Sequence, residues 1–193
     1  IYFMMHRHFL LHKPHSYLSQ FIYEQKRKKR LLGDLFDFPE GTMAIGRLDE
    51  DSEGLLFLTT DGKVSEQVRS KKVEKEYYAQ VDGIITQEAV DEMTKGVEIG
   101  INGSKYLTRN CKAHLIYELP NYIGEGRRIR DERHGPTSWV SLTLTEGKFR
   151  QVRKMTAAVG FPTLRLVRIR IGNTSLEGLN TGEVLEVEEF QYQ

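Results

Sequence analysis

The feature that most constrains the fold of this chain is a series of short segments with strand character. Turns and a small number of helical segments separate them. In residues 75–81, Tyr77, Ala79 and Val81 alternate with polar or bulky residues, which places them on one face of a strand. The patterns predict strands at 8–12, 55–60, 75–81, 112–119, 137–145 and 164–171, and helices at 63–69, 86–95 and 149–159. Because these elements do not follow a regular strand–helix–strand order, we predict an α+β fold. Its central sheet is mixed and mostly antiparallel, flanked by helices and long loops.

Length and composition indicate a globular protein of one domain, or of one large and one small domain. The chain has 193 residues, of which 39% are hydrophobic and 28% charged, as in an ordinary soluble protein. Its single cysteine, Cys111, excludes an intrachain disulfide and a cysteine-based zinc site, and favours a cytoplasmic location. The longest apolar run, Ile1–Met5, is too short for a membrane span. We predict residues 1–8 to be an N-terminal extension or vector residues, and 9–193 a single domain.

The net charge of +1 conceals a separation of the two signs along the chain. Residues 34–66 contain nine acids and only two bases, whereas residues 147–176 contain seven bases and no acid. Two further basic runs lie at 26–30 (KRKKR) and 127–130 (RRIR). This pattern is typical of a protein that holds a polyanion on one face.

The helix predicted at 149–159 carries part of this basic charge. Phe149, Val152, Met155 and Val159 have the spacing of a buried face. The basic residues Arg150, Arg153 and Lys154 fall on another face of the same predicted helix.

The tract GRLDEDSEGLLFL at 46–58 contains the densest group of chemically active residues. Its acids match the start of a calcium-binding loop, but the bidentate Glu required at the twelfth position is Thr60. Asp49 is therefore either a turn residue or a carboxylate that acts as nucleophile or base on a nucleic-acid sugar. A glycosidase pair of Asp49 and Glu53 is a weaker alternative. Tyr77 is either a core residue or a stacking surface for a base.

Other catalytic signatures are missing from the sequence. No serine–histidine–aspartate elbow, phosphate-binding glycine loop or dinucleotide fingerprint occurs. His6, His8 and His12 have no accompanying ligand cluster, so we predict no metal site.

Three ordered motifs resemble those of RNA pseudouridine synthases, and among them the bacterial RsuA-type branch that modifies ribosomal RNA. They are GRLDEDSEGLLFLTTDG at 46–62, KEYYAQVDG at 75–83, and TEGKFRQVRKM at 145–155 followed by GFPTLRLVRIRIG at 160–172. The resemblance extends from about Phe9 to Val187. It implies an isomerase that converts a uridine of large-subunit (23S) ribosomal RNA to pseudouridine without metal, redox group or other cofactor. A non-catalytic RNA-binding relative is the alternative, but both Asp49 and Tyr77 are present.

The resemblance also implies roles for individual residues. Asp49 matches the catalytic aspartate, Tyr77 the ring that stacks on the target base, and Arg153 the basic partner of the aspartate. An arginine beside a carboxylate keeps it ionised and oriented. We expect RNA contacts from Lys13, Arg47, Arg127, Arg128, Arg130, Arg150, Arg168 and Arg170.

Two departures from the family pattern affect these expectations. Many relatives have glycine where Ser16 stands, and many carry an N-terminal S4-type RNA-binding module, for which we expect no room before Phe9. RNA contact is then expected from the catalytic domain itself, including the run 26–30, which is otherwise a solvated linker. We expect the protein to act as a monomer with no membrane partner.

Overall fold

The computed structural model describes residues 5–193, and these group into two compact units. The first contains the chain up to Val73 together with Arg170–Gln193, and the second contains Glu74–Ile169. Residues 1–4 of the predicted N-terminal extension lie outside the described residues, residues 5–7 have no regular structure, and His8 begins the first strand. The single domain expected over 9–193 stays a prediction.

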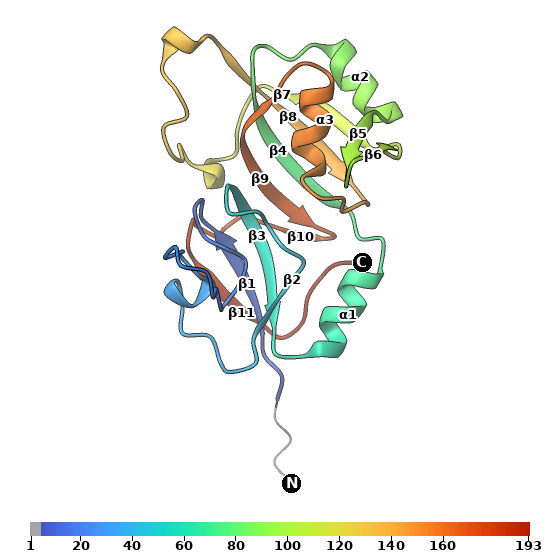
Figure 1. Cartoon of the computed structure of the whole chain (residues 1–193). Coiled ribbons are helices and arrows are strands. Elements are labelled where there is room, and N and C mark those ends of the chain that lie inside the picture. The colour runs from blue at the N-terminus through green and yellow to red at the C-terminus, as the bar shows by residue number, and fades with distance from the viewer. Residues whose placement is uncertain (1–4) are drawn as a thin grey trace. The chain divides into compact units, whose positions relative to one another are not determined.

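The first unit is built around β3 (Ser52–Thr59), a strand in which all eight residues are buried. Antiparallel to it run β1 (His8–Lys13) and β2 (Met43–Ile45), and β1 also pairs with β11 (Val184–Val187). The unit also contains η1 (Leu32–Asp34), α1 (Gly62–Ser70) and β10 (Thr174–Ser175), and Figure 1 labels its strands and α1. The apolar residues of β3 and β1 form its core, where Phe57 stacks on Phe190 with ring centroids 4.4 Å apart.

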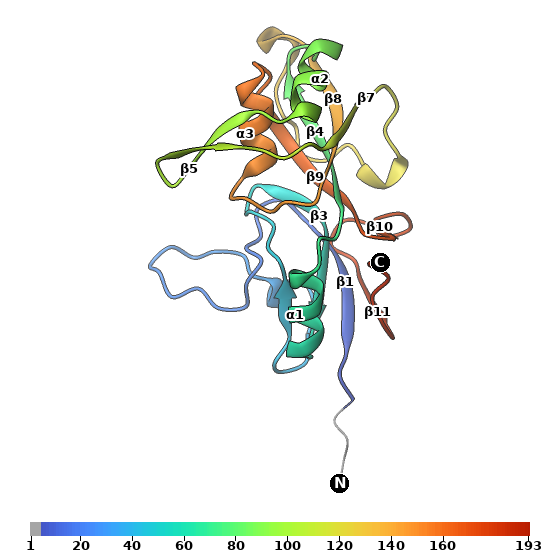
Figure 2. The same cartoon turned by 90° about the vertical axis from the view of Figure 1, so that its right-hand side faces the viewer.

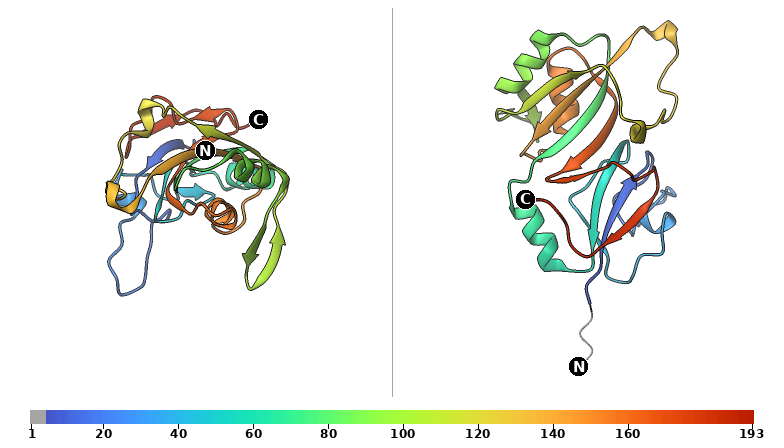
Figure 3. Two further views of the ribbon diagram at one scale, coloured as in Figure 1. Left: turned by 90° about the horizontal axis from the view of Figure 1, so that it is seen from above. Right: turned by 180° about the vertical axis from the view of Figure 1, so that it is seen from behind.

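The second unit contains a sheet in the order β9-β4-β8-β7, covered by helices. Its strands are β4 (Lys75–Asp82), β7 (Lys112–Ile116), β8 (Thr137–Leu144) and β9 (Thr163–Ile171), and β4 pairs antiparallel with β8 along its whole length. The helices α2 (Gln87–Lys95) and α3 (Gln151–Ala158) pack their buried residues on one face of this sheet (Figure 3). The predicted α+β class with a mostly antiparallel sheet is confirmed.

One hairpin in the second unit was not predicted. Strands β5 (Glu98–Ile101) and β6 (Ser104–Leu107) pair antiparallel around Asn102 and Gly103, which both have positive φ angles, 49° and 77°. Asn-Gly between two short strands is a hairpin signal, because this turn requires two residues that tolerate positive φ.

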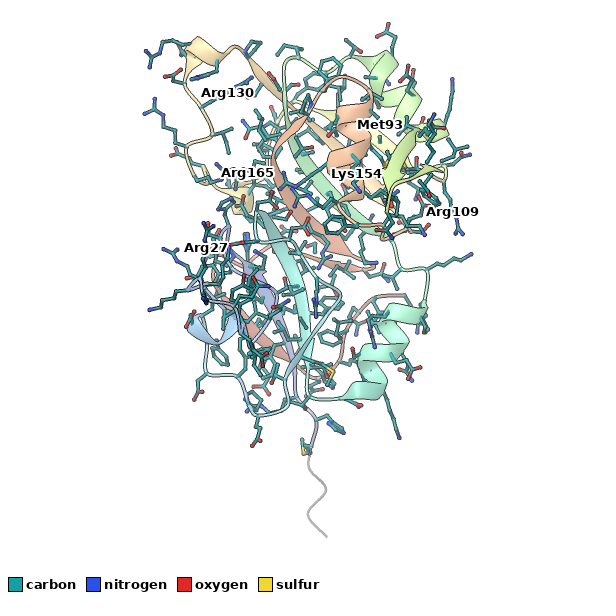
Figure 4. All side chains as sticks on the ribbon, in the orientation of Figure 1. Arg27, Met93, Arg109, Arg130, Lys154 and Arg165 are labelled. Carbon is teal, nitrogen blue, oxygen red and sulfur yellow. The ribbon has the colours of Figure 1, made fainter. Side chains whose placement is uncertain are left out.

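Residues 120–136 (PNYIGEGRRIRDERHGP), which show no apolar periodicity in the sequence, form a long loop with two single-turn helices, η2 (Asn121–Ile123) and η3 (Glu132–His134). Arg165 of β9 holds it: its guanidinium donates to the carbonyl oxygens of Ile123 (2.8 Å) and Gly124 (3.2 Å). Figure 4 shows Arg165 at this loop.

Candidate active site

Asp49 lies in the first unit, in the turn immediately before β3. The N–H of Ser52 donates to the Asp49 carbonyl oxygen at 3.0 Å, which closes the turn. Ser19 fixes the preceding residue, because its hydroxyl donates to the Leu48 carbonyl (2.7 Å) and accepts from the Leu48 N–H (3.0 Å). The Asp49 side chain is half-buried. The turn therefore presents a partly exposed carboxylate on a fixed backbone, at the end of a wholly buried strand.

Lys13 lies beneath this acidic turn. It is fully buried, pairs with Gly54 in the sheet, and donates from Nζ to the carbonyl oxygens of Pro14 and Tyr17, both at 2.8 Å. Burial lowers the pKa of its ammonium to about 8, although the carboxylates of Glu53, Asp51, Glu50 and Asp49 raise it in part. The prediction that Lys13 contacts RNA is wrong, because its ammonium is enclosed and bonded within the protein.

Tyr77 lies in the second unit, on the face of β4 that it shares with Ala79 and Val81. It pairs with Leu142 across the β4–β8 ladder and packs, half-buried, against the apolar core. The alternation predicted for this strand is confirmed. Two residues before it, Lys75 is partly buried, and burial together with the positive charge of Arg168 lowers its pKa.

Arg153 lies on α3, an element that contacts β4 in the same unit. Its neighbours Val152 and Met155 are buried in the core, as the helical spacing predicted, while Arg153 itself is half-buried. The structure thus brings the elements of Tyr77 and Arg153 into contact, whereas Asp49 belongs to the other unit.

The start of α3 differs from the prediction. Arg150 has a left-handed backbone (φ 51°) and precedes the helix, which begins at Gln151. As a result Phe149 is outside the helix and 67% exposed, so its predicted place in the core is wrong. Arg150 likewise is not part of a helical face with Arg153 and Lys154.

The remaining expected RNA contacts differ in exposure. Arg47, Arg127 and Arg128 are exposed, and Arg150 and Arg170 are half-buried. Arg130 is largely used within the protein, because it donates to Asp82 (2.6 Å) and to the Pro136 carbonyl (2.8 Å). Arg168 is only 2% exposed, so it offers no surface for a backbone phosphate, and this expectation is corrected. A count of basic residues cannot distinguish exposed cations from buried ones.

Glu146 lies in the TEGKFRQVR motif, but its residue type alone did not identify it as part of the candidate site. Its carboxylate accepts from the Tyr106 hydroxyl, from the Arg109 N–H (3.0 Å) and from Gln151 Nε2 (2.8 Å). Burial acts to raise the pKa of Glu146, but these hydrogen bonds outweigh it and lower the pKa. Glu146 therefore joins the β5–β6 hairpin to the first turn of α3, which carries Arg153.

The described part of the chain contains neither a metal-binding cluster of side chains nor a helix able to span a membrane. Between residues 5 and 193, no three His, Cys, Asp or Glu residues are grouped so that they could hold a metal ion. No helix in that range combines the length and the apolar character that crossing a bilayer requires.

Comparison with known proteins places this fold and its motifs in one class. Residues 7–158 match the family model described as RNA pseudouridylate synthase, and the chain belongs to this family. It is an RsuA-type pseudouridine synthase, and so an isomerase.

The similar proteins have specific names. The chain is 40% identical to "Ribosomal large subunit pseudouridine synthase E" of Xanthomonas axonopodis pv. citri, over 88% of each chain. It is 38% identical to the protein of the same name from Vibrio vulnificus, over 92% of this chain and 74% of that one. A crystal structure of a pseudouridylate synthase matches 94% of this chain and 70% of its own, with TM-score 0.74 and 26% identity. The predicted family is thereby confirmed.

Proposed function

We propose that this protein converts one uridine of large-subunit ribosomal RNA to pseudouridine. The observation that carries the proposal is the 40% identity, over 88% of both chains, to a synthase named for the ribosomal large subunit. A match that covers nearly the whole of both chains supports the same reaction more strongly than a match to one motif does.

The reaction needs a balanced exchange of bonds within one nucleotide. The bond between C1′ and N1 breaks, the uracil turns, and a bond forms between C1′ and C5. C5 then loses its proton and N1 gains one, so no atom or electron enters from outside. The base must leave its stack so that the enzyme can reach C1′, which costs a few kcal/mol and makes local RNA structure part of the specificity.

We assign the catalytic roles to three residues. Asp49 is the carboxylate that acts on the sugar of the flipped uridine, Tyr77 provides a ring against which the base stacks, and Arg153 is the cationic partner of Asp49. The half-buried state of all three supports these roles, since each can meet a substrate while its backbone stays fixed. Charge-assisted pairing with arginine favours the ionised carboxylate.

RNA affinity in this proposal comes from exposed or half-buried arginines of the catalytic domain. They are Arg47, Arg127, Arg128, Arg150 and Arg170. These five arginines, if each contacts a phosphate, contribute roughly −3.5 to −4.5 to the slope of log affinity against log salt. We further propose that the protein acts as a monomer in the cytoplasm.

The test uses the purified protein and separate transcripts of large-subunit and small-subunit ribosomal RNA. Pseudouridine is mapped by carbodiimide modification and primer extension, with Asp49→Asn as the inactive control. We expect one new site in the large-subunit transcript alone. Pseudouridine formed only in small-subunit RNA or in transfer RNA would contradict the substrate assignment, and none in any RNA would contradict the activity.

A further inference from the structure

The basic run at residues 26–30 belongs to an arm, Gln20–Arg30, that leaves the first unit and returns to it. Two backbone hydrogen bonds close its base: the Leu18 N–H donates to the Arg30 carbonyl (2.9 Å), and the Leu32 N–H to the Gln20 carbonyl (3.0 Å). Figure 2 and the left view of Figure 3 show the arm extending away from the strands of its unit. The arm is therefore a projecting loop with a fixed base.

The outer part of the arm has the composition of a nucleic-acid contact. Lys26, Arg27 and Lys28 are consecutive and exposed, and Figure 4 labels Arg27 among the side chains of the first unit. Ile22, on the same outer part, is 72% exposed. Three adjacent exposed cations beside the exposed Ile22 and the half-buried Tyr23 suit an RNA backbone with unstacked bases better than an acidic protein surface.

The inner ends of the arm hold the two residues that flank Asp49. On the entry side, the Ser19 hydroxyl makes both of its hydrogen bonds to Leu48. On the exit side, Lys29 Nζ donates to both carboxylate oxygens of Glu50, at 2.9 and 2.8 Å. The base of the arm is thus hydrogen-bonded both to the residue before Asp49 and to the residue after it.

The exposure of the Lys29–Glu50 ion pair limits how much it can contribute to the stability of the fold. Its side chains are 26% and 38% exposed, and pairs with that much exposure contribute little to folding. Orientation is a different matter, because displacing a reactive group by about 1 Å can lower a rate by about a hundredfold. The pair can therefore matter for turnover while hardly affecting stability.

We propose that the Gln20–Arg30 arm binds the RNA backbone and that Lys29, through Glu50, is a positioning residue for Asp49. RNA held by the outer arm fixes its base, and the base fixes the turn that carries the carboxylate. This inference rests on the proposed function, because it assigns Asp49 to the reaction.

The positioning half is tested by breaking and exchanging the ion pair. Lys29→Met and Glu50→Gln are expected to lower kcat at saturating RNA by about tenfold each. The exchanged pair, Lys29→Glu with Glu50→Lys, is expected to recover most of that loss. Unfolding midpoints should stay within about 3 °C of the parent, which separates a positioning role from a structural one. Values of kcat within twofold of the parent in both single variants would overturn the positioning role.

The binding half is tested on the outer arm. The triple variant Lys26→Gln, Arg27→Gln, Lys28→Gln is expected to weaken RNA binding about tenfold or more at physiological salt. Three lost phosphate contacts should make the slope of log affinity against log salt shallower by about two. The matched control is Lys63→Gln, an exposed lysine of the same unit outside the arm, which should behave as the parent. An unchanged slope in the triple variant would place the RNA elsewhere.

Failure of this inference can be told apart from failure of the proposed function. If the parent makes pseudouridine and both single variants equal it, the function stands and the positioning role falls. If the parent makes none in large-subunit RNA, the function falls, while the salt slopes still decide whether the arm binds RNA.

Discussion

The turn that carries Asp49 and the β4–α3 pair that carries Tyr77 and Arg153 are held by different kinds of interaction. The turn is fixed by polar contacts from loops: the Ser19 hydroxyl on Leu48, the Lys29 ammonium on Glu50, and the buried Lys13 beneath the acidic residues. The β4–α3 pair is fixed by apolar packing, with Ala79, Val81, Val152 and Met155 all buried in one core.

We therefore expect changes in the polar turn to affect mainly catalysis, and changes in the apolar β4–α3 pair to affect mainly stability. Each hydrogen bond or surface ion pair contributes about 1 kcal/mol or less in net terms, so the turn can be altered without unfolding the protein. Removing a buried apolar side chain costs several times more, because the lost burial is combined with a cavity. Substitutions in the two regions should therefore separate loss of activity from loss of fold.

The largest effect is expected at Asp49. Asp49→Asn keeps the shape of the side chain and removes its negative charge, so turnover should fall by roughly four powers of ten, about 5 kcal/mol of activation free energy. The unfolding midpoint and RNA affinity should stay close to those of the parent. Multiple turnover by purified Asp49→Asn would remove this residue from its assigned role.

In the apolar region the largest effect should be on stability. Met155 is fully buried in the core, so Met155→Ala should lower the free energy of unfolding by about 2–5 kcal/mol in urea titrations. Its turnover under folding conditions should fall far less than that of Asp49→Asn. A variant as stable as the parent would show that α3 is not held by this core.

Lys13 tests the polar region through pH. Its pKa is about 8 in the folded protein against an ordinary 10.5, so between these values the unfolded chain binds more protons and stability rises with pH. The unfavourable term is fully present below pH 8, and up to about 3 kcal/mol of it is relieved by pH 10.5.

The measurement compares the free energy of unfolding of the parent with that of Lys13→Met from pH 7 to 10.5. The parent should gain stability relative to the variant. Burial raises the pKa of Cys111 to about 11, which makes stability fall above pH 9, but that contribution is common to both proteins and cancels. A constant difference across this range would show that Lys13 titrates normally.

The regions also differ in how far the sequence predicts them. Period-two alternation identified β4, and the helix predicted at 86–95 matches α2, which has Thr86 as its N-cap and Gly96 as its C-cap. Thr86 accepts from the Ala89 N–H (3.2 Å), and Gly96 ends the helix with φ 98°. Alternation and helix capping are set by residues close together in the sequence. The strands and helices of the second unit pack as these local signals predict.

Contacts between loops are not encoded by any period. Ser19 and Leu48 are 29 residues apart, and nothing in either tract indicates that they meet. The same limit explains the errors with cations: Lys13 and Arg168 have the residue type of an RNA contact but are buried. Catalytic residues were proposed from motif resemblance, which carries information about chemistry that periodicity lacks.

Arg153 combines features of both regions, because it is a charged, half-buried residue on a helix whose Val152 and Met155 pack in the apolar core. Because it is half-buried, Arg153→Ala should change stability by less than about 1 kcal/mol. If Arg153 is the cationic partner of Asp49, as proposed, its loss should lower turnover about 10- to 100-fold. The control is Lys95→Ala, an exposed cation on α2 of the same unit. Equal turnover in Arg153→Ala and the control would show that Arg153 is not the partner of Asp49.

The smallest effect is expected from removing divalent metal. The acidic turn concentrates Asp49, Glu50, Asp51 and Glu53, but their charges already act on the Lys13 ammonium, and Lys29 pairs with Glu50. Two protein cations thus supply the counter-charge that a metal ion would provide, so the turn should keep its geometry without one.

With a short RNA that needs no magnesium to fold, turnover in excess EDTA should equal turnover without EDTA. Full-length ribosomal RNA serves as the contrast, because its own folding depends on magnesium. If chelation abolishes turnover on the short RNA and added Mg²⁺ or Ca²⁺ restores it, the acidic turn holds a metal. The polar region would then be organised by that ion and not by Lys13 and Lys29.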